Sequence, residues 1–98
     1  MNMQAMLRQA QKMQKDMQKT QEEINNTEFT GKSELVSVKM MGDRIVKEVK
    51  ISSEELEKDD IEVIEDMVLI AVNDALKQID KVTEEKMGAY TKGMPGLF

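Results

Sequence analysis

Four cationic side chains near the start of the chain have a spacing suited to a common chemistry. They follow one another at steps of four, three and four residues, and we call them the cationic row: Arg8, Lys12, Lys15 and Lys19. Such steps keep residues on one face of an α-helix, which predicts a line of positive charge about 16 Å long. A line of this kind can neutralise several backbone phosphates of a nucleic acid duplex. The common alternative is a hydrated helix face without a partner.

The net charge of −5 is unevenly distributed along the chain. Residues 1–50 hold nine Lys and Arg against seven acids, whereas residues 51–98 hold five against twelve. A protein of net negative charge is repelled from nucleic acid and from anionic membranes, so such a partner has to meet the basic part locally. The overall balance opposes nucleic acid binding, and the distribution favours it at the cationic row.

Most catalytic chemistries lack their residues in this sequence. The absence of Cys and His excludes disulfides, thiolate nucleophiles, imidazole bases and imidazole metal ligands. No glycine-rich phosphate loop is present, since Gly31-Lys32-Ser33 lacks the upstream Gly that such a loop requires. We therefore predict that the protein is not an enzyme and has no cofactor and no small-molecule substrate.

Five acids gather where a second helix is predicted to begin: Asp59, Asp60, Glu62, Glu65 and Asp66. Carboxylates can bind a hard cation, but this group lacks the spacing and the Gly of a calcium-binding loop. Acids at a helix start are also favoured by the helix dipole. We predict a capping role for them and no metal site.

The sequence also bears on the compartment. No apolar stretch follows Arg8, so we expect no signal peptide, and the longest fully apolar run is residues 67–72. A membrane-spanning helix needs about 20 apolar residues, so we predict no membrane partner. A chain without Cys fits a reducing cytoplasm.

The cationic row requires a helix, and residues 1–25 have the composition for one. They contain no Gly or Pro and are rich in Gln, Lys, Met and Ala. Their apolar residues alternate at steps of three and four, with Thr20 at the remaining position, and we call this line the apolar seam: Met3, Met6, Ala10, Met13, Met17, Thr20 and Ile24. The cationic row lies roughly opposite this seam, so burial of the seam directs the row outward.

Three strands are predicted to follow. The first begins near Phe29, and alternation of apolar and polar residues at 36–40 predicts the second. Gly42-Asp43 predicts a hairpin turn, and residues 44–51 predict a return strand with Ile45, Val49 and Ile51 on one face. The result is a three-stranded antiparallel meander.

A long second helix completes the chain. Residues 52–56 predict a short capped turn, and Asp59 is the predicted N-cap, with Glu62 closing a capping box. The helix is expected to end near Met87-Gly88, because Gly commonly terminates helices. Residues 93–98 have the composition of a flexible tail.

The middle of this helix predicts a homodimer. Residues 67–72 are apolar on every side, and a three-stranded sheet covers only one side of a helix. With only 3% aromatic residues and ten Met, the core of one chain is thin, and small domains often complete such cores by oligomerising. The predicted interface comprises Met67, Val68, Ala71, Val72, Asn73, Asp74 and Ala75.

Three stretches carry a family resemblance: residues 6–13, residues 64–75 and the ending Gly93-Met-Pro-Gly-Leu-Phe98. Together they resemble the YbaB/EbfC family of small bacterial nucleoid-associated proteins. The resemblance implies a helix–three strands–helix protomer, a tweezer-like homodimer and DNA binding without catalysis. Asn73 and Asp74 match the polar pair of that family, and we interpret them as hydrogen-bonding interface residues. The cationic row matches the family's basic first helix in character.

We therefore predict an α/β chain of the two-layer α+β type, with residues 1–98 as a single domain. It is expected to form an intertwined homodimer with projecting helical arms. The arms would bind duplex DNA through phosphates, with low sequence specificity, at the cytoplasmic nucleoid. The alternative is a dimeric adaptor whose Met-rich arms bind another protein rather than DNA.

Overall fold

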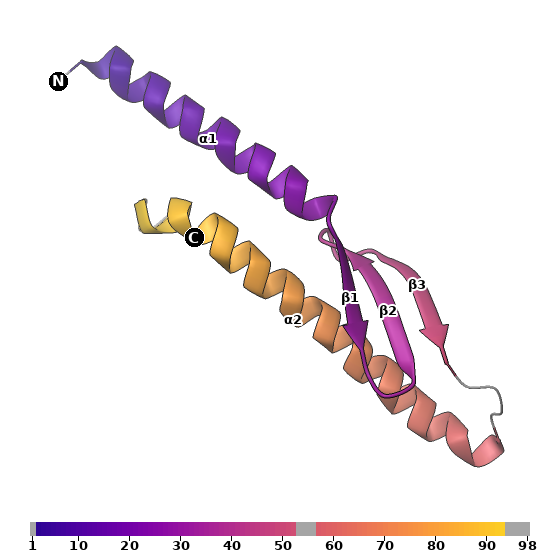
Figure 1. Ribbon diagram of the computed structural model, residues 1–98. Coiled ribbons are helices and arrows are strands. Elements are labelled where there is room, and N and C mark those ends of the chain that lie inside the picture. Colours follow the sequence, from indigo (N-terminus) through magenta and orange to yellow (C-terminus); the bar gives the residue numbers. More distant parts are fainter. Residues whose placement is uncertain (1, 53–56, 94–98) are drawn as a thin grey trace.

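The computed structural model, which describes residues 2–52 and 57–93, is an elongated two-layer molecule of 71 × 21 × 13 Å (Figure 1). One layer is an antiparallel sheet with strand order β1-β2-β3, and the other is a long helix that crosses it. The elements in chain order are α1 Met3–Asn25, β1 Glu28–Lys32, β2 Val36–Met41, β3 Val46–Ile51, a 3-10 turn η1 Lys58–Asp60 and α2 Ile61–Gly93. The predicted succession of helix, antiparallel meander and long helix is confirmed.

The core lies between α2 and the first two strands. Alternate residues of β2 point into it, among them Val38 and Met40, and small residues of α2 meet them, among them Ala71 and Ala75. Gly31 makes this close contact possible, because a Cβ atom there would lie 2.0 Å from the carbonyl oxygen of Ala71. Backbone therefore packs on backbone where β1 crosses α2.

The hairpin between β2 and β3 follows the predicted turn at Gly42-Asp43. The N–H of Arg44 donates to the carbonyl of Met41 at 2.8 Å, and Arg44 adopts a positive φ of 72°. This residue in the left-handed region ends the turn, so β3 starts at Val46 rather than at Arg44.

The register of β3 differs from the prediction. Lys39 pairs with Glu48 but Met40 pairs with Val46, so Lys47 is an extra residue that forms a bulge. The bulge places Val46, instead of Lys47, opposite Met40. Val46 therefore replaces Ile45 on the side of β3 that carries Val49 and Ile51. An alternating pattern cannot show a bulge, because it assumes an uninterrupted period of two.

Both ends of α2 also differ from the prediction. Asp59 is not the N-cap: η1 precedes the helix, and the N–H of Glu57 donates to the carboxylate of Asp60 at 3.0 Å. At the other end, α2 continues through Gly88 to Gly93. Packing of α2 beside α1 outweighs the tendency of Gly to end a helix. The predicted turn at 52–56 falls largely on residues 53–56, and the predicted tail on residues 94–98, all outside the described residues.

Candidate nucleic-acid interface

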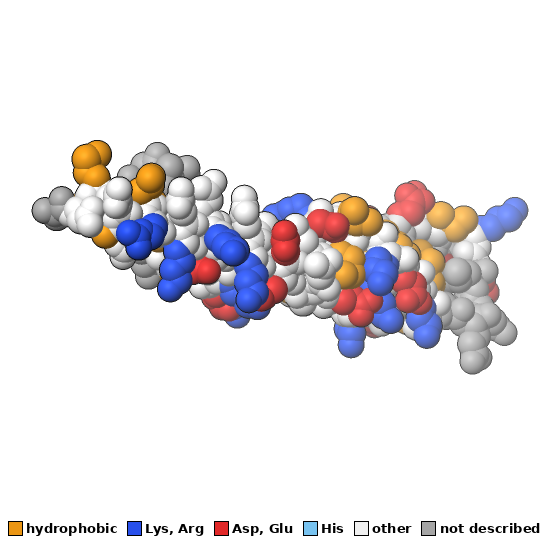
Figure 2. Space-filling view, turned by 90° about the horizontal axis from the view of Figure 1, so that it is seen from above, with side chains coloured by type: hydrophobic (Ala, Val, Ile, Leu, Met, Phe, Trp, Pro, Cys, Tyr) orange, Lys and Arg blue, Asp and Glu red, His pale blue; other side chains and the backbone are white. Residues whose placement is uncertain are grey.

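The cationic row lies on the exposed side of α1. Its four side chains are exposed. The apolar seam, which we now call the α1 seam, lies on the opposite side and is progressively covered towards the end of α1: Met13 and Met17 are half-buried and Ile24 is fully buried. Figure 2 shows cationic side chains gathered along the end of the molecule that α1 forms. The predicted helix and the outward direction of the row are thus present in the structure.

The C-terminal end of α1 is held by contacts with the β2–β3 turn and with α2. A Cβ atom at Gly42 would lie 1.8 Å from the carbonyl oxygen of Ile24, so the end of α1 packs directly on the β2–β3 turn. The hydroxyl groups of Thr20 and Tyr90 form a 3.3 Å hydrogen bond between α1 and α2. The first half of α1 projects beyond these contacts as an arm, and Met3 is 83% exposed.

The charges of the cationic row are available to a ligand. Among the described residues, the ion pairs join Lys39 to Glu48 and Arg44 to Asp80, and neither includes a member of the row. Asp16 is the sole acid in the first twenty-one residues of the sequence. The arm therefore presents a strongly cationic surface within an acidic protein.

The residues predicted to form the dimer interface differ in how deeply the chain's own sheet buries them. Ala71 and Ala75 are fully buried in the core against the chain's own sheet. The side chains of Met67, Val68 and Val72 are half-buried and pack on the same core. They face the sheet because the apolar stripe of α2 is needed first to complete the core of a single chain.

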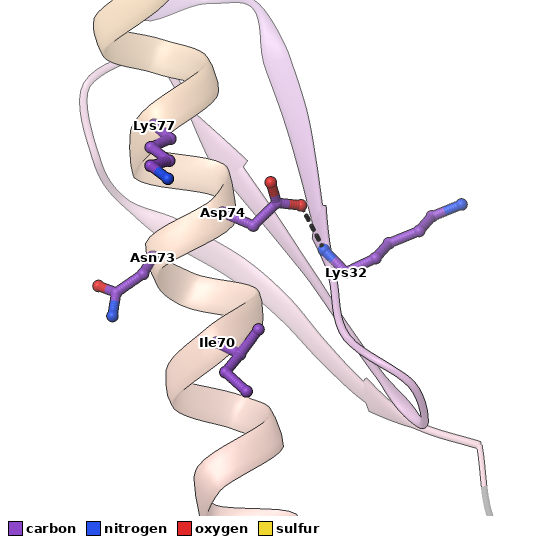
Figure 3. A pocket seen from close by; sticks show the side chains of 5 residues that line it. All are labelled: Lys32, Ile70, Asn73, Asp74 and Lys77. Carbon is purple, nitrogen blue, oxygen red and sulfur yellow. Dashed lines mark hydrogen bonds between the residues drawn. The ribbon is translucent and has the colours of Figure 1, made fainter.

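Asn73 and Asp74 also have different environments (Figure 3). The Asp74 carboxylate accepts a 2.9 Å hydrogen bond from the backbone N–H of Lys32, and Gln78 donates both to Asp74 and to the carbonyl of Thr30. These side chains occupy backbone groups on the outer edge of β1. Asn73 is exposed on the outer side of α2.

Sequence reasoning did not identify which apolar residues remain uncovered. On α2 these include Leu69 and Ile70, which are 61% and 55% exposed. On β3, Val46, Val49 and Ile51 share the core-facing side of the sheet, but α2 packs against β1 and β2, and they remain 41–49% exposed. The all-apolar stretch at 67–72 was the available signal for the first group.

The profile of the YbaB/EbfC DNA-binding family matches residues 1–94. The chain belongs to this family. Among its YbaB/EbfC relatives, a protein of Lactococcus lactis subsp. cremoris strain MG1363 named "Nucleoid-associated protein" is 56% identical, over 97% of this chain and 98% of its own length. A protein of Enterococcus faecalis with the same name is 47% identical, over 98% of this chain and 94% of its own length.

A solved structure has the same fold. An uncharacterized protein from Helicobacter pylori superposes with a TM-score of 0.71 over 94% of this chain and 97% of its own length, at 23% identity. Both the family resemblance and the fold class expected from the sequence are confirmed.

A shallow open hollow of about 390 Å³ lies between β1 and α2, lined by Lys32, Ile70, Asn73, Asp74 and Lys77. Over the described residues, no group of three or more acids is placed to hold a metal ion. No helix in the described part of the chain is long and apolar enough to cross a membrane.

Proposed function

We propose that this YbaB/EbfC protein binds duplex DNA as a homodimer, mainly through phosphate contacts made by the cationic row. Binding of this kind has low sequence specificity, because phosphates carry no base information. It suits a role at the bacterial nucleoid, in DNA organisation or gene expression, and no catalytic step is involved. The carrying observation is the exposed cationic row, which forms no ion pair within the described part of the chain, on a projecting arm of a DNA-binding family member.

The electrostatics support local contact at the arm. The row spans about 16 Å along α1, so its cations can meet successive phosphates of a duplex strand. Each neutralised phosphate releases a counterion and contributes about −0.9 to the slope of log affinity against log salt. Full use of both rows in a homodimer would give a slope near −7, and partial use a slope of about −3 to −4.

The uncovered apolar side chains support the homodimer. Leu69 and Ile70 flank the exposed Asn73 on the outer side of α2, and the apolar residues of β3 extend the core-facing side of the sheet. A second copy that covered these surfaces would thicken a core poor in aromatic residues. The interface proposed here therefore keeps Asn73 and adds the exposed neighbours Leu69 and Ile70.

Fluorescence anisotropy of a labelled random-sequence duplex tests the proposal. The protein is titrated into the duplex at several salt concentrations. We expect saturable binding that weakens steeply with salt and is similar for unrelated sequences. No binding even at low salt would contradict the proposal and favour the adaptor, whose capture of a protein partner would be insensitive to salt.

A charge-reversed variant assigns the binding to the row. In Lys12→Glu/Lys15→Glu we expect weaker binding to all sequences alike, with a salt slope shallower by about 2 to 4 units. The matched control is Lys50→Glu/Lys58→Glu, which makes the same change of net charge on exposed residues of β3 and η1, outside α1. Equal losses in the two variants would mean that net charge, and not the row, governs binding.

A further inference from the structure

The α1 seam continues as an apolar line beyond the part that α2 covers. Exposure along the seam rises from 0% at Ile24, through half-buried Met17 and Met13, to 51% at Met6 and 83% at Met3. Leu7 widens the seam and is 60% exposed. A groove lined by Met3, Met6, Leu7 and Ala10 lies on this open part.

The open part begins where α2 stops. The two helices run antiparallel, and the contact between Thr20 and Tyr90 sets their relative position (Figure 1). Three residues further along α2, Gly93 is therefore level with about Met17 of α1. The groove starts at Ala10, about 10 Å further along α1 at a rise of 1.5 Å per residue.

The residues that follow α2 match this groove in chemistry and in length. Residues 94–98 read Met-Pro-Gly-Leu-Phe, so four of the five are apolar, and Phe98 is one of only two Phe in the chain. Five extended residues reach about 16–18 Å. Leu7 lies about 15 Å from the level of Gly93, whereas Met3 lies about 21 Å away. The segment can therefore cover Ala10, Leu7 and Met6 but not Met3.

We propose that residues 94–98 fold back onto the arm of their own chain, where Leu97 and Phe98 pack among Met6, Leu7 and Ala10. Met side chains adapt readily to an irregular apolar partner, which suits this contact. The docked segment continues the cover that α2 gives to the rest of the α1 seam. It also ties the part of the arm that carries Arg8 to the end of α2.

Methyl NMR with a nitroxide label tests the contact. The chain has no Cys, so Gly96→Cys provides a unique attachment site in protein labelled with ¹³C at its Met methyl groups. We expect loss of the Met6 methyl signal, which is identified by Met6→Leu, while the Met40 signal persists and reports an intact core. A label at Lys58→Cys, in η1 before the start of α2 and thus far from the end of α2 at Gly93, should leave Met6 unaffected.

Two further samples decide the origin of the effect. In a mixture of spin-labelled chains without ¹³C and ¹³C-labelled chains without a nitroxide, the Met6 signal should remain, because the contact lies within one chain. In Leu97→Ser/Phe98→Ser that carries the ¹³C label but no nitroxide, the chemical shift of the Met6 methyl group should change, since the ring current of Phe98 is lost. An unchanged Met6 signal beside the Gly96→Cys label would overturn the proposal. Loss of the Met6 signal in the mixed sample as well would overturn it in favour of a contact with a second copy.

Discussion

Gly31 is the residue at which the two layers of the fold come closest. Its missing side chain leaves room for the carbonyl oxygen of Ala71 and the backbone nitrogen of Ala75, which would lie 2.0 and 2.6 Å from a Cβ atom. Both neighbours belong to the helix backbone and cannot rotate away. Any added side chain therefore has to push α2 off the sheet.

The first prediction compares two Gly→Ala variants. Gly31→Ala should lower the free energy of unfolding by about 3 kcal/mol, because overpacking at a backbone contact displaces the helix. Gly88→Ala should raise it by about 0.5–1 kcal/mol, since Ala favours a helix and, apart from the adjoining helix backbone, a Cβ there meets no atom of the described residues within 4 Å. Urea denaturation measures both, and similar values for the two variants would contradict the close packing at Gly31.

Asp74 and its neighbour Asn73 provide a second contrast at the scale of single residues. Its carboxylate binds the backbone N–H of Lys32 within the same chain, whereas neighbouring Asn73 is exposed. A substitution at Asp74 should therefore act on the fold of each chain, and one at Asn73 on association between chains.

For Asp74→Ala we expect a loss of about 1–2 kcal/mol of unfolding free energy, because a donor on β1 loses its charged acceptor. Asp74→Asn keeps an acceptor oxygen and should lose less. Urea denaturation at several protein concentrations measures this, and the loss should be the same at each concentration. A loss that varies with concentration would instead indicate an interface role.

At the scale of elements, the two halves of α1 are stabilised by different contacts. Its second half is held by α2 and the β2–β3 turn, while its first half begins with a cap: the Asn2 side chain accepts from the N–H of Gln4 at 3.0 Å. Local capping matters most where tertiary contacts are few.

Asn2→Ala should therefore fray the first turn of α1. The loss of a cap costs about 1 kcal/mol, which corresponds to about fivefold faster amide exchange at Gln4 and Ala5. Asn2→Asp keeps the acceptor and should retain the protection. Hydrogen exchange followed by NMR measures this, with the Ile24 amide as an internal reference that should not change.

The elements also explain what the sequence could predict. Periodicity identified α1, the strands and α2, because each buries a regular face: the α1 seam, the alternation at 36–40 and the stripe of α2. The bulge at Lys47, the continuation of α2 past Gly88 and the bond from Asp74 to β1 depend on contacts between distant segments. For the candidate site, helical spacing predicted the row and its exposure, but not which apolar residues of α2 stay uncovered.

At the scale of the whole molecule, the proposed homodimer links assembly to DNA binding. Leu69 is 61% exposed and contributes little to the core of its own chain. A charge there should leave the fold intact and oppose the approach of a second copy, since burial of an unpaired charge is costly.

In Leu69→Asp we expect a mass of 11.2 kDa by sedimentation equilibrium where the unmodified chain shows twice that value. The salt slope of DNA binding should fall to about half, because one cationic row then acts alone. The control is Ala89→Asp, which adds the same charge to an exposed position of α2. A dimeric Leu69→Asp variant would exclude this face as the interface.

The two edges of the sheet are unequal, and this limits how the chain can aggregate. On β1, Asp74 accepts from the outward N–H of Lys32 and Gln78 donates to the outward carbonyl of Thr30, whereas within the described residues α2 provides no comparable cover for β3. Strand pairing between molecules can therefore proceed at one edge of each sheet only. Such pairing joins two copies and then has no free edge left, so the fold resists growth into open-ended fibrils.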